Sequence, residues 1–132
     1  MASKRCALDV GLLVADLEAA LQFYGGLLDL EVHTELTTSL IGQGRMVQLR
    51  VGDSLLKLVQ LGELPPPAEP GLTGRLGFRY LTVPVTDIAA RLRRLQEAGN
   101  EVALPLTRLP NGTLIVMVRD PEGNTVELVQ EP

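Results

Sequence analysis

Four side chains with chemically useful groups lie at related positions in the two halves of this sequence. They are Asp9, Lys57, Tyr80 and Glu127. A carboxylate can bind a divalent cation or act as a general base, and a phenol or an ammonium can stabilise a negative oxygen. Two carboxylates that face one cavity repel each other unless a cation lies between them. The sequence therefore favours an ion pair of Lys57 with Asp9, Glu127 or both.

An internal repeat relates these four positions. Val14–Leu17 and Val85–Ile88 share one pattern at an offset of 71 residues, and Asp9 and Tyr80 precede the two copies at the same distance. Further along the chain, Lys57 and Glu127 end two short segments that align at an offset of 70 residues. The sequence thus predicts two copies of one structural plan.

The first half predicts a strand, a helix and three more strands. Residues 7–14 are apolar except for Asp9, as in a buried strand. Asp16 is a suitable N-cap for a helix with an apolar stripe, and the pair Gly25-Gly26 is expected to help end that helix. Strands are then expected at residues 30–36, 46–51 and 55–61.

The second half repeats this order after a proline-rich linker. A strand at 78–85 precedes a helix that Thr86 or Asp87 caps and that runs to about Ala98, with Gly99 as its stop. Strands follow at residues 101–106, 113–118 and 125–129. We therefore predict one domain over 1–132, made of module 1 (about 7–61), a linker (62–76) and module 2 (about 77–130).

Each module is expected to be βαβββ, so that its helix covers only one face of its four strands. Strand residues alternate between faces, and this alternation is expected to point the four reactive side chains away from the helices. Two modules side by side would then form a curved, eight-stranded mixed sheet around a cavity, which is an α+β fold. Arg50 and Met117 are expected to line that cavity.

Composition excludes several classes of protein. The net charge of −4 at pH 7 provides no basic surface for nucleic acid, and no apolar run reaches the roughly 18 residues that a membrane span needs. No apolar segment of a secretory signal follows the first charged residues, and a single cysteine suits a reducing cytoplasm. We expect Cys6 to be a small apolar filler in a strand, and His33 to be a solvated edge residue.

Three segments together resemble the vicinal oxygen chelate superfamily, which includes glyoxalases, bleomycin resistance proteins and extradiol dioxygenases. Val10–Tyr24 resembles the opening strand and helix of that family, Leu27–Val32 its next loop and strand, and Asp120–Leu128 its closing turn and strand. The resemblance implies a glyoxalase-like fold and a homodimer. It also implies a metal held by two ligands from each half, commonly His, Gln or Glu.

The residues at those four ligand positions depart from the family pattern, since only Glu127 keeps the family's residue type. Asp9 could bind a hard cation, whereas Tyr80 is a poor ligand unless it is ionised. An ammonium has three donors and no acceptor, so Lys57 opposes a metal. We therefore expect no metal and no other cofactor, with the ammonium in the place of the metal.

The resemblance and the residues leave three functions open. The first is a small-molecule-binding protein, with Asp9, Arg50, Lys57, Tyr80 and Met117 as ligand contacts. The second is a lyase or isomerase that uses Glu127 as a general base, with or without a divalent metal. The third is a non-catalytic structural module whose cavity its own side chains fill.

Overall fold

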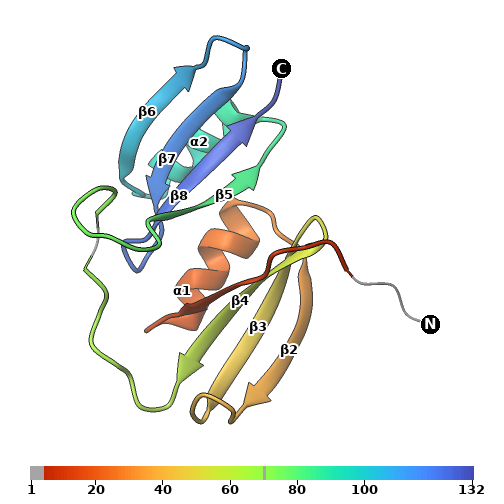
Figure 1. Ribbon diagram of the computed structural model, residues 1–132, viewed down its shortest axis with the longest axis vertical. Helices are drawn as coiled ribbons and strands as arrows, with labels where there is room; N and C mark the ends of the chain where they lie inside the picture. Colours follow the sequence, from red (N-terminus) through yellow and green to blue (C-terminus); the bar gives the residue numbers. More distant parts are fainter. Residues whose placement is uncertain (1–4, 70) are drawn as a thin grey trace. The chain divides into compact units, whose positions relative to one another are not determined.

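The computed structural model describes residues 5–69 and 71–132, which divide into unit 1 (Met1–Pro67) and unit 2 (Ala68–Pro132). Figure 1 shows the strands and helices of each unit. Among the described residues, no helix is long and apolar enough to cross a membrane. The elements of unit 1 are β1 (Val10–Leu13), α1 (Leu17–Leu21), the π-helix η1 (Gln22–Leu27), β2 (Val32–Thr38), β3 (Gly44–Val51) and β4 (Ser54–Leu61).

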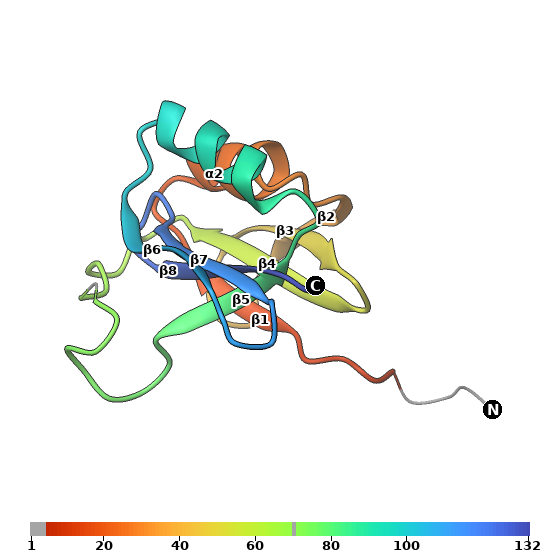
Figure 2. The same ribbon diagram turned by 90° about the horizontal axis from the view of Figure 1, so that it is seen from above.

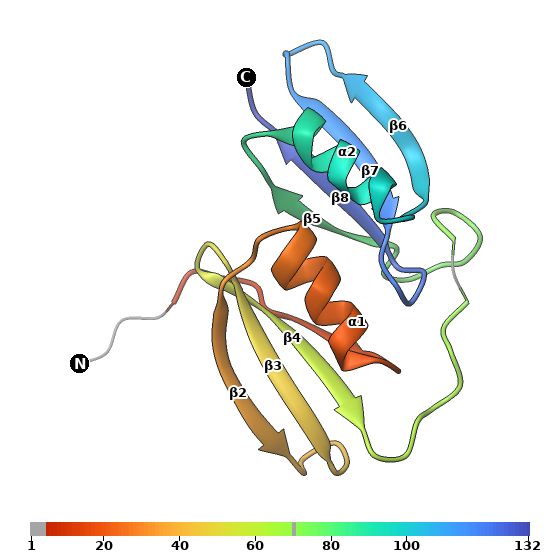
Figure 3. The same ribbon diagram turned by 180° about the vertical axis from the view of Figure 1, so that it is seen from behind.

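Unit 1 is a four-stranded sheet with one face covered by α1 and η1, as Figure 3 shows from behind. The strand order is β1-β4-β3-β2, in which β1 runs parallel to β4 and the other neighbours are antiparallel. Apolar residues at helical spacing form the covered layer, because Leu17, Phe23 and Tyr24 are each at most 1% exposed. They pack on the sheet side that carries Leu49 and Leu58, which are also fully buried.

Unit 2 has the same architecture, and Figure 2 shows α2 above its sheet. The strand order is β5-β8-β7-β6, with β5 parallel to β8. Ile88 and Leu95 are the fully buried residues of α2. The fully buried apolar residues of the sheet below it are Val83, Val116, Val118, Val126 and Leu128. The elements are β5 (Tyr80–Pro84), α2 (Ile88–Glu97), β6 (Val102–Arg108), β7 (Leu114–Arg119) and β8 (Thr125–Gln130).

The internal repeat extends to the register of the strands. Gly11 of β1 is the partner of Lys57 in β4, and Thr82 of β5 is the partner of Glu127 in β8. These pairs are related by the same offsets of 71 and 70 residues as the sequence patterns. The predicted α+β class, with two tandem βαβββ modules, is therefore confirmed. The eight strands of the described residues form two hydrogen-bonded sheets of four.

A glutamine from the last strand caps the helix in each unit. The Gln60 side-chain carbonyl accepts from the Leu17 N–H at 2.7 Å, and Gln130 accepts in the same way from Ile88 at 2.8 Å. The first helical N–H groups have no partner within the helix, so each glutamine satisfies one of them. Asp16 also caps α1 as predicted, by accepting from the Ala19 N–H at 3.0 Å.

Two predictions about the helices were right in position but not in mechanism. Asp87 occupies the N-cap position of α2, but its side chain makes no capping hydrogen bond there and lies 3.3 Å from the Arg91 guanidinium. The glycine pair at 25–26 does not end the first helix, which continues through both as η1. Burial of Phe23 and Tyr24, whose rings pack edge to face at 4.7 Å, supports the helical backbone against the preference of the two glycines.

Candidate functional site

The carboxylate of Asp9 is held by three partners within unit 1. It lies one residue before β1, so the strand begins later than predicted. The Asp9 carboxylate accepts from the Arg5 guanidinium at 2.5 Å and from the Leu55 N–H at 2.9 Å. The Lys57 ammonium lies 3.8 Å from the same carboxylate. The predicted pairing of Lys57 with Asp9 is therefore present, and Arg5 is a partner that sequence analysis missed.

These contacts keep Asp9 ionised. The hydrogen bond from Arg5 is the largest cause that holds the pKa of Asp9 below its ordinary value of 3.8, followed by the hydrogen bond from the Leu55 backbone. Both contacts favour the charged carboxylate, and the nearby Lys57 adds to this effect. Asp9 is thus an anion at any pH near neutrality, and its lone pairs are already shared with protein donors.

Lys57 occupies the middle of the sheet face that the helix leaves open. Its partners are Gly11 in β1 and Gln48 in β3, and the alternation of strand residues places all three on this face. The neighbouring residues Leu56 and Leu58 point the other way and are buried under the helix. The predicted orientation of Lys57 is correct, because no bulge interrupts the β3–β4 register.

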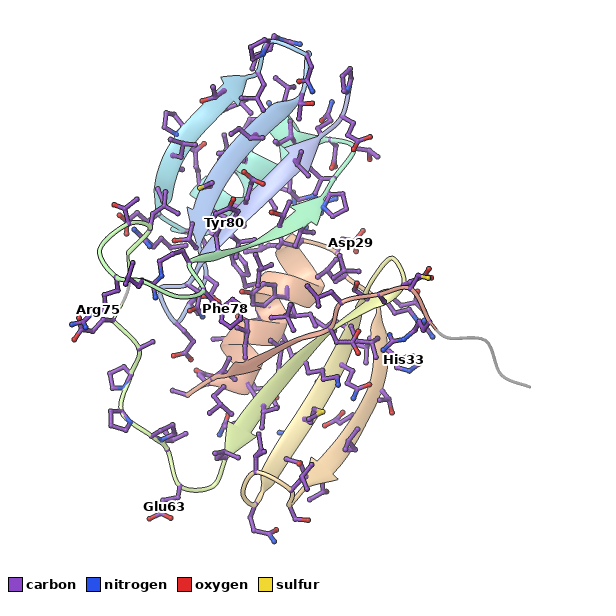
Figure 4. All side chains as sticks on the ribbon, viewed as in Figure 1. Asp29, His33, Glu63, Arg75, Phe78 and Tyr80 are labelled. Carbon is purple, nitrogen blue, oxygen red and sulfur yellow. The ribbon has the colours of Figure 1, made fainter. Side chains whose placement is uncertain are left out.

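Glu127 occupies the matched position in unit 2. It lies between Thr82 of β5 and Met117 of β7, on the open face of the sheet. The Thr82 hydroxyl donates to one Glu127 carboxylate oxygen at 2.9 Å. Tyr80 lies on the edge strand β5, where Figure 4 labels it, and it is 53% exposed. The structure therefore brings Glu127 and Met117 together, whereas Tyr80 pairs with Thr125 instead of with Glu127.

The donor set of unit 1 does not fit a divalent metal. A metal needs lone pairs, but Lys57 presents only N–H donors and the Asp9 carboxylate already accepts from Arg5 and Leu55. Within each unit, the described residues include no group of three His, Cys, Asp or Glu side chains that could hold a metal ion. The two positions of unit 1 therefore offer an internal ion pair instead of two metal ligands.

Two other sequence predictions have different outcomes. His33 is exposed on the edge strand β2, as predicted, and Figure 4 labels it there. Cys6 is an exposed free thiol four residues before β1, so its prediction as a small apolar filler at the start of a strand was wrong. Residues 5–9, before β1, make no strand pairing. The Arg5 guanidinium instead contacts the Asp53 carbonyl and Asp9.

An open hollow of about 560 Å³ lies elsewhere in unit 2, at one end of the sheet. Arg119, Glu101 and Asp120 contribute its charged groups. Asp120 is 5% exposed and accepts from the backbone N–H groups of Glu122 and Asn124, so it fixes the turn before β8. The charged groups of this hollow are thus engaged with each other or with the turn.

Comparison with known families agrees with the fold. The sequence profile of the glyoxalase/bleomycin resistance protein/dioxygenase superfamily matches residues 7–128, which is nearly the whole chain. The chain belongs to this superfamily. The matched residues cover both βαβββ units. A separate search of individual curated proteins found no match.

Solved structures of the glyoxalase superfamily are similar along almost their full length. A glyoxalase family protein from Bacillus cereus is 20% identical, with a TM-score of 0.81 and coverage of 98% of this chain and 96% of that chain. A glyoxalase family protein from Enterococcus faecalis is 25% identical, with a TM-score of 0.65 and coverage of 95% and 94%. At these identities the similarity supports the shared fold.

Proposed function

We propose that this chain is a small-molecule-binding protein of the glyoxalase/bleomycin-resistance type that has lost the superfamily's metal site. The observation that carries the proposal is the Lys57 ammonium 3.8 Å from the Asp9 carboxylate. The resemblance implies that these residues correspond to two positions where metal-dependent relatives carry ligands, which supports the proposal. A protonated lysine repels a divalent cation and satisfies the charge of the carboxylate without one.

The open sheet faces supply the proposed ligand contacts. A small-molecule site usually combines an apolar surface with a few polar groups that orient the ligand. In unit 1 the polar groups are Asp9, Lys57 and Arg50, beside Leu55 on the same face. In unit 2 they are Tyr80 and Glu127, with Met117 as an adaptable apolar contact.

Metal analysis and native mass spectrometry test this proposal together. Protein purified without chelators is expected to contain no stoichiometric metal, and its melting temperature is expected to stay unchanged when EDTA is added. A co-purified small molecule seen in native spectra and lost on mild denaturation would support the binding function. Stoichiometric zinc, nickel, manganese or iron that is lost in Asp9→Ala and Glu127→Ala would overturn the loss of the metal site.

A lyase or isomerase function is the second candidate, and the geometry of Glu127 favours it. Thr82 donates to one carboxylate oxygen, which orients the group on the open face and leaves the second oxygen to take a proton from a bound substrate. Glu127→Gln keeps the shape and the acceptor for Thr82 but removes the base. If that variant binds the native ligand unchanged and loses turnover, the chain is an enzyme. If no turnover of the identified ligand exists in the unmodified protein, binding alone is its function.

A further inference from the structure

Three hydrogen-bond donors lie side by side on the open face of unit 1. Gln48 in β3 is the direct cross-strand partner of Lys57 in β4, and Arg50 is the partner of Leu55. Residues directly opposite each other in an antiparallel pair share one face, so Gln48, Arg50 and Lys57 all lie on it. Arg50 and Lys57 are diagonal neighbours, within reach of one group held between two long side chains.

Arg50 and Lys57, the two cations of this group, both have N–H donors available for a ligand. Among residues 5–69 and 71–132, the Arg50 guanidinium makes no hydrogen bond or ion pair, and it is exposed on the sheet. Among the same described residues, the one ion-pair partner of Lys57 is Asp9, at 3.8 Å. That distance exceeds a hydrogen bond, and Asp9 is already engaged by Arg5 and the Leu55 N–H. The ammonium of Lys57 therefore has N–H donors available for a ligand.

The chain leaves space beside these donors. Gly11 is the other strand neighbour of Lys57, and no described heavy atom beyond residues 10–12 lies within 4 Å of the position that a Cβ on Gly11 would take. The neighbouring Leu13 is 48% exposed, although it is a large apolar side chain. A donor cluster beside an exposed apolar side chain can accept the charged end and the apolar body of one organic molecule.

The matched positions in unit 2 lack these properties. Gly11, Lys57 and Gln48 correspond to Thr82, Glu127 and Met117 in the same register. Arg119 corresponds to Arg50, but its guanidinium donates to the Thr125 hydroxyl at 2.9 Å and to the Gly123 carbonyl at 3.4 Å. The two units therefore share the same strand register, but the cationic donors that are available to a ligand lie on the open face of unit 1.

We propose that the open face of unit 1 binds a small organic acid through a single carboxylate group. Arg50 and Lys57 hold the carboxylate by charge-assisted hydrogen bonds, Gln48 adds a neutral donor, and the apolar body lies over Gly11 and Leu13. This inference rests on the proposed small-molecule function and gives it a ligand class. Asp9 makes a monoanion the preferred ligand, because its fixed negative charge repels a dianion more strongly.

An NMR titration of the full isotopically labelled chain tests the ligand class. Benzoate is the probe, benzamide is its neutral counterpart, and phenyl phosphate is the dianion. Benzoate is expected to shift the backbone signals of β1, β3 and β4 around Gly11, Gln48 and Lys57, and to bind about tenfold more tightly than benzamide. Phenyl phosphate is expected to bind more weakly than benzoate.

Charge-neutral variants locate the site. Lys57→Met and Arg50→Met are each expected to weaken benzoate binding about tenfold and to leave benzamide binding unchanged. Arg45→Met is the matched control, because Arg45 lies on the same strand but on the opposite face, where it pairs with Glu35. It removes the same charge, so a general electrostatic effect would weaken binding equally in this control.

Two more variants test the site in protein whose folded state is checked by its NMR signals. Gly11→Leu is expected to abolish benzoate binding while amide signals of unit 2 stay in place, because the added side chain fills open space. Asp9→Asn keeps the acceptor for the Leu55 N–H and is expected to strengthen binding of phenyl phosphate more than that of benzoate.

Equal binding of benzoate and benzamide, or an Arg45→Met loss as large as the Lys57→Met loss, would overturn the carboxylate site. Benzamide binding on the same face would then still support a neutral small-molecule site, whereas no binding by any probe would count against both proposals.

Discussion

At the residue scale, hydrogen bonds from neighbouring groups stabilise the negative charge of Asp9, although its side chain is mostly shielded from solvent. Its side chain is 19% exposed, and it accepts from the Arg5 guanidinium and the Leu55 N–H. One hydrogen bond ties the segment before β1 to Asp9, and the other ties Asp9 to β4. Asp9 is thus both a charged group of the open face and a structural link between the start of unit 1 and its last strand.

The lowered pKa of Asp9 predicts a pH dependence of stability. A carboxyl group with a lower pKa in the folded state stabilises the fold above its unfolded pKa, and this contribution is lost as the pH falls through the folded pKa. For Asp9 the loss therefore begins near 3.8 and continues below it. Urea unfolding from pH 5 down to pH 2.5 should show this loss, and Asp9→Asn should reduce it.

Asp53→Asn is the control for that measurement, because Arg5 contacts the backbone carbonyl of Asp53 and not its carboxylate. This variant is expected to keep the acid dependence of the unmodified chain. An Asp9→Asn variant with an unchanged acid dependence would show that the contacts of Asp9 do not stabilise the folded state.

The pairing of Lys57 with Asp9 could be predicted from the sequence, but the complete surroundings of the carboxylate could not. Alternation along β4 places Lys57 on the open face, and that pattern is visible in the sequence. Arg5 and the Leu55 N–H escaped prediction because both depend on where β1 begins and on the contacts of the preceding segment with the start of β4. Neither property leaves a periodic signal.

At the element scale, the glutamine caps connect each helix with the last strand of its unit. Gln130→Met removes the acceptor for the Ile88 N–H and keeps the length of the side chain. We expect this change to lower the free energy of unfolding by about 1 kcal/mol. Gln130→Glu keeps an acceptor at the helix N-terminus and is expected to preserve the stability.

Urea unfolding followed by circular dichroism measures these effects. Gln96→Met is the matched control, because Gln96 is an exposed residue of the same helix α2. If Gln130→Met were no less stable than Gln96→Met, the cap would have no energetic role.

The turn after the first helix provides another prediction at this scale. Asp29 has a φ of 60°, and Gly99, its counterpart in the repeat, has a φ of 89°. A left-handed backbone costs a residue with a side chain about 1–2 kcal/mol, with less for aspartate. Asp29→Gly is therefore expected to raise the melting temperature slightly, and Gly99→Asp to lower it. Calorimetry on both variants measures the difference, and a lower melting temperature for Asp29→Gly would contradict the explanation.

Most elements could be predicted from the sequence, because apolar periodicity and turn residues mark them. The exceptions have tertiary causes. The glycine pair at 25–26 weakens a helix, yet burial of Phe23 and Tyr24 retains it as η1. Asp87 has the side chain of a capping residue, but Gln130 from a strand 42 residues away satisfies the helix instead. A local pattern cannot reveal a competing partner so distant in the sequence.

At the scale of the whole molecule, the superfamily resemblance predicts a homodimer. Both sheets have edge strands, and β2 exposes Val32 and Leu36 along one of them. Apolar edge strands are surfaces on which a second copy can dock. Sedimentation velocity over a range of protein concentrations is expected to show a species of twice the chain mass, and Leu36→Lys to shift it toward the monomer. A monomer at all concentrations would contradict this prediction.

The glutamine caps also have a consequence for folding during synthesis on the ribosome. In each unit the first strand pairs with the last, and the helix is capped by that same last strand across 43 and 42 residues. Neither helix can therefore complete its contacts until the end of its unit has left the ribosome. Every described element of unit 1 lies within residues 10–61, so unit 1 can finish folding before the synthesis of unit 2 is complete.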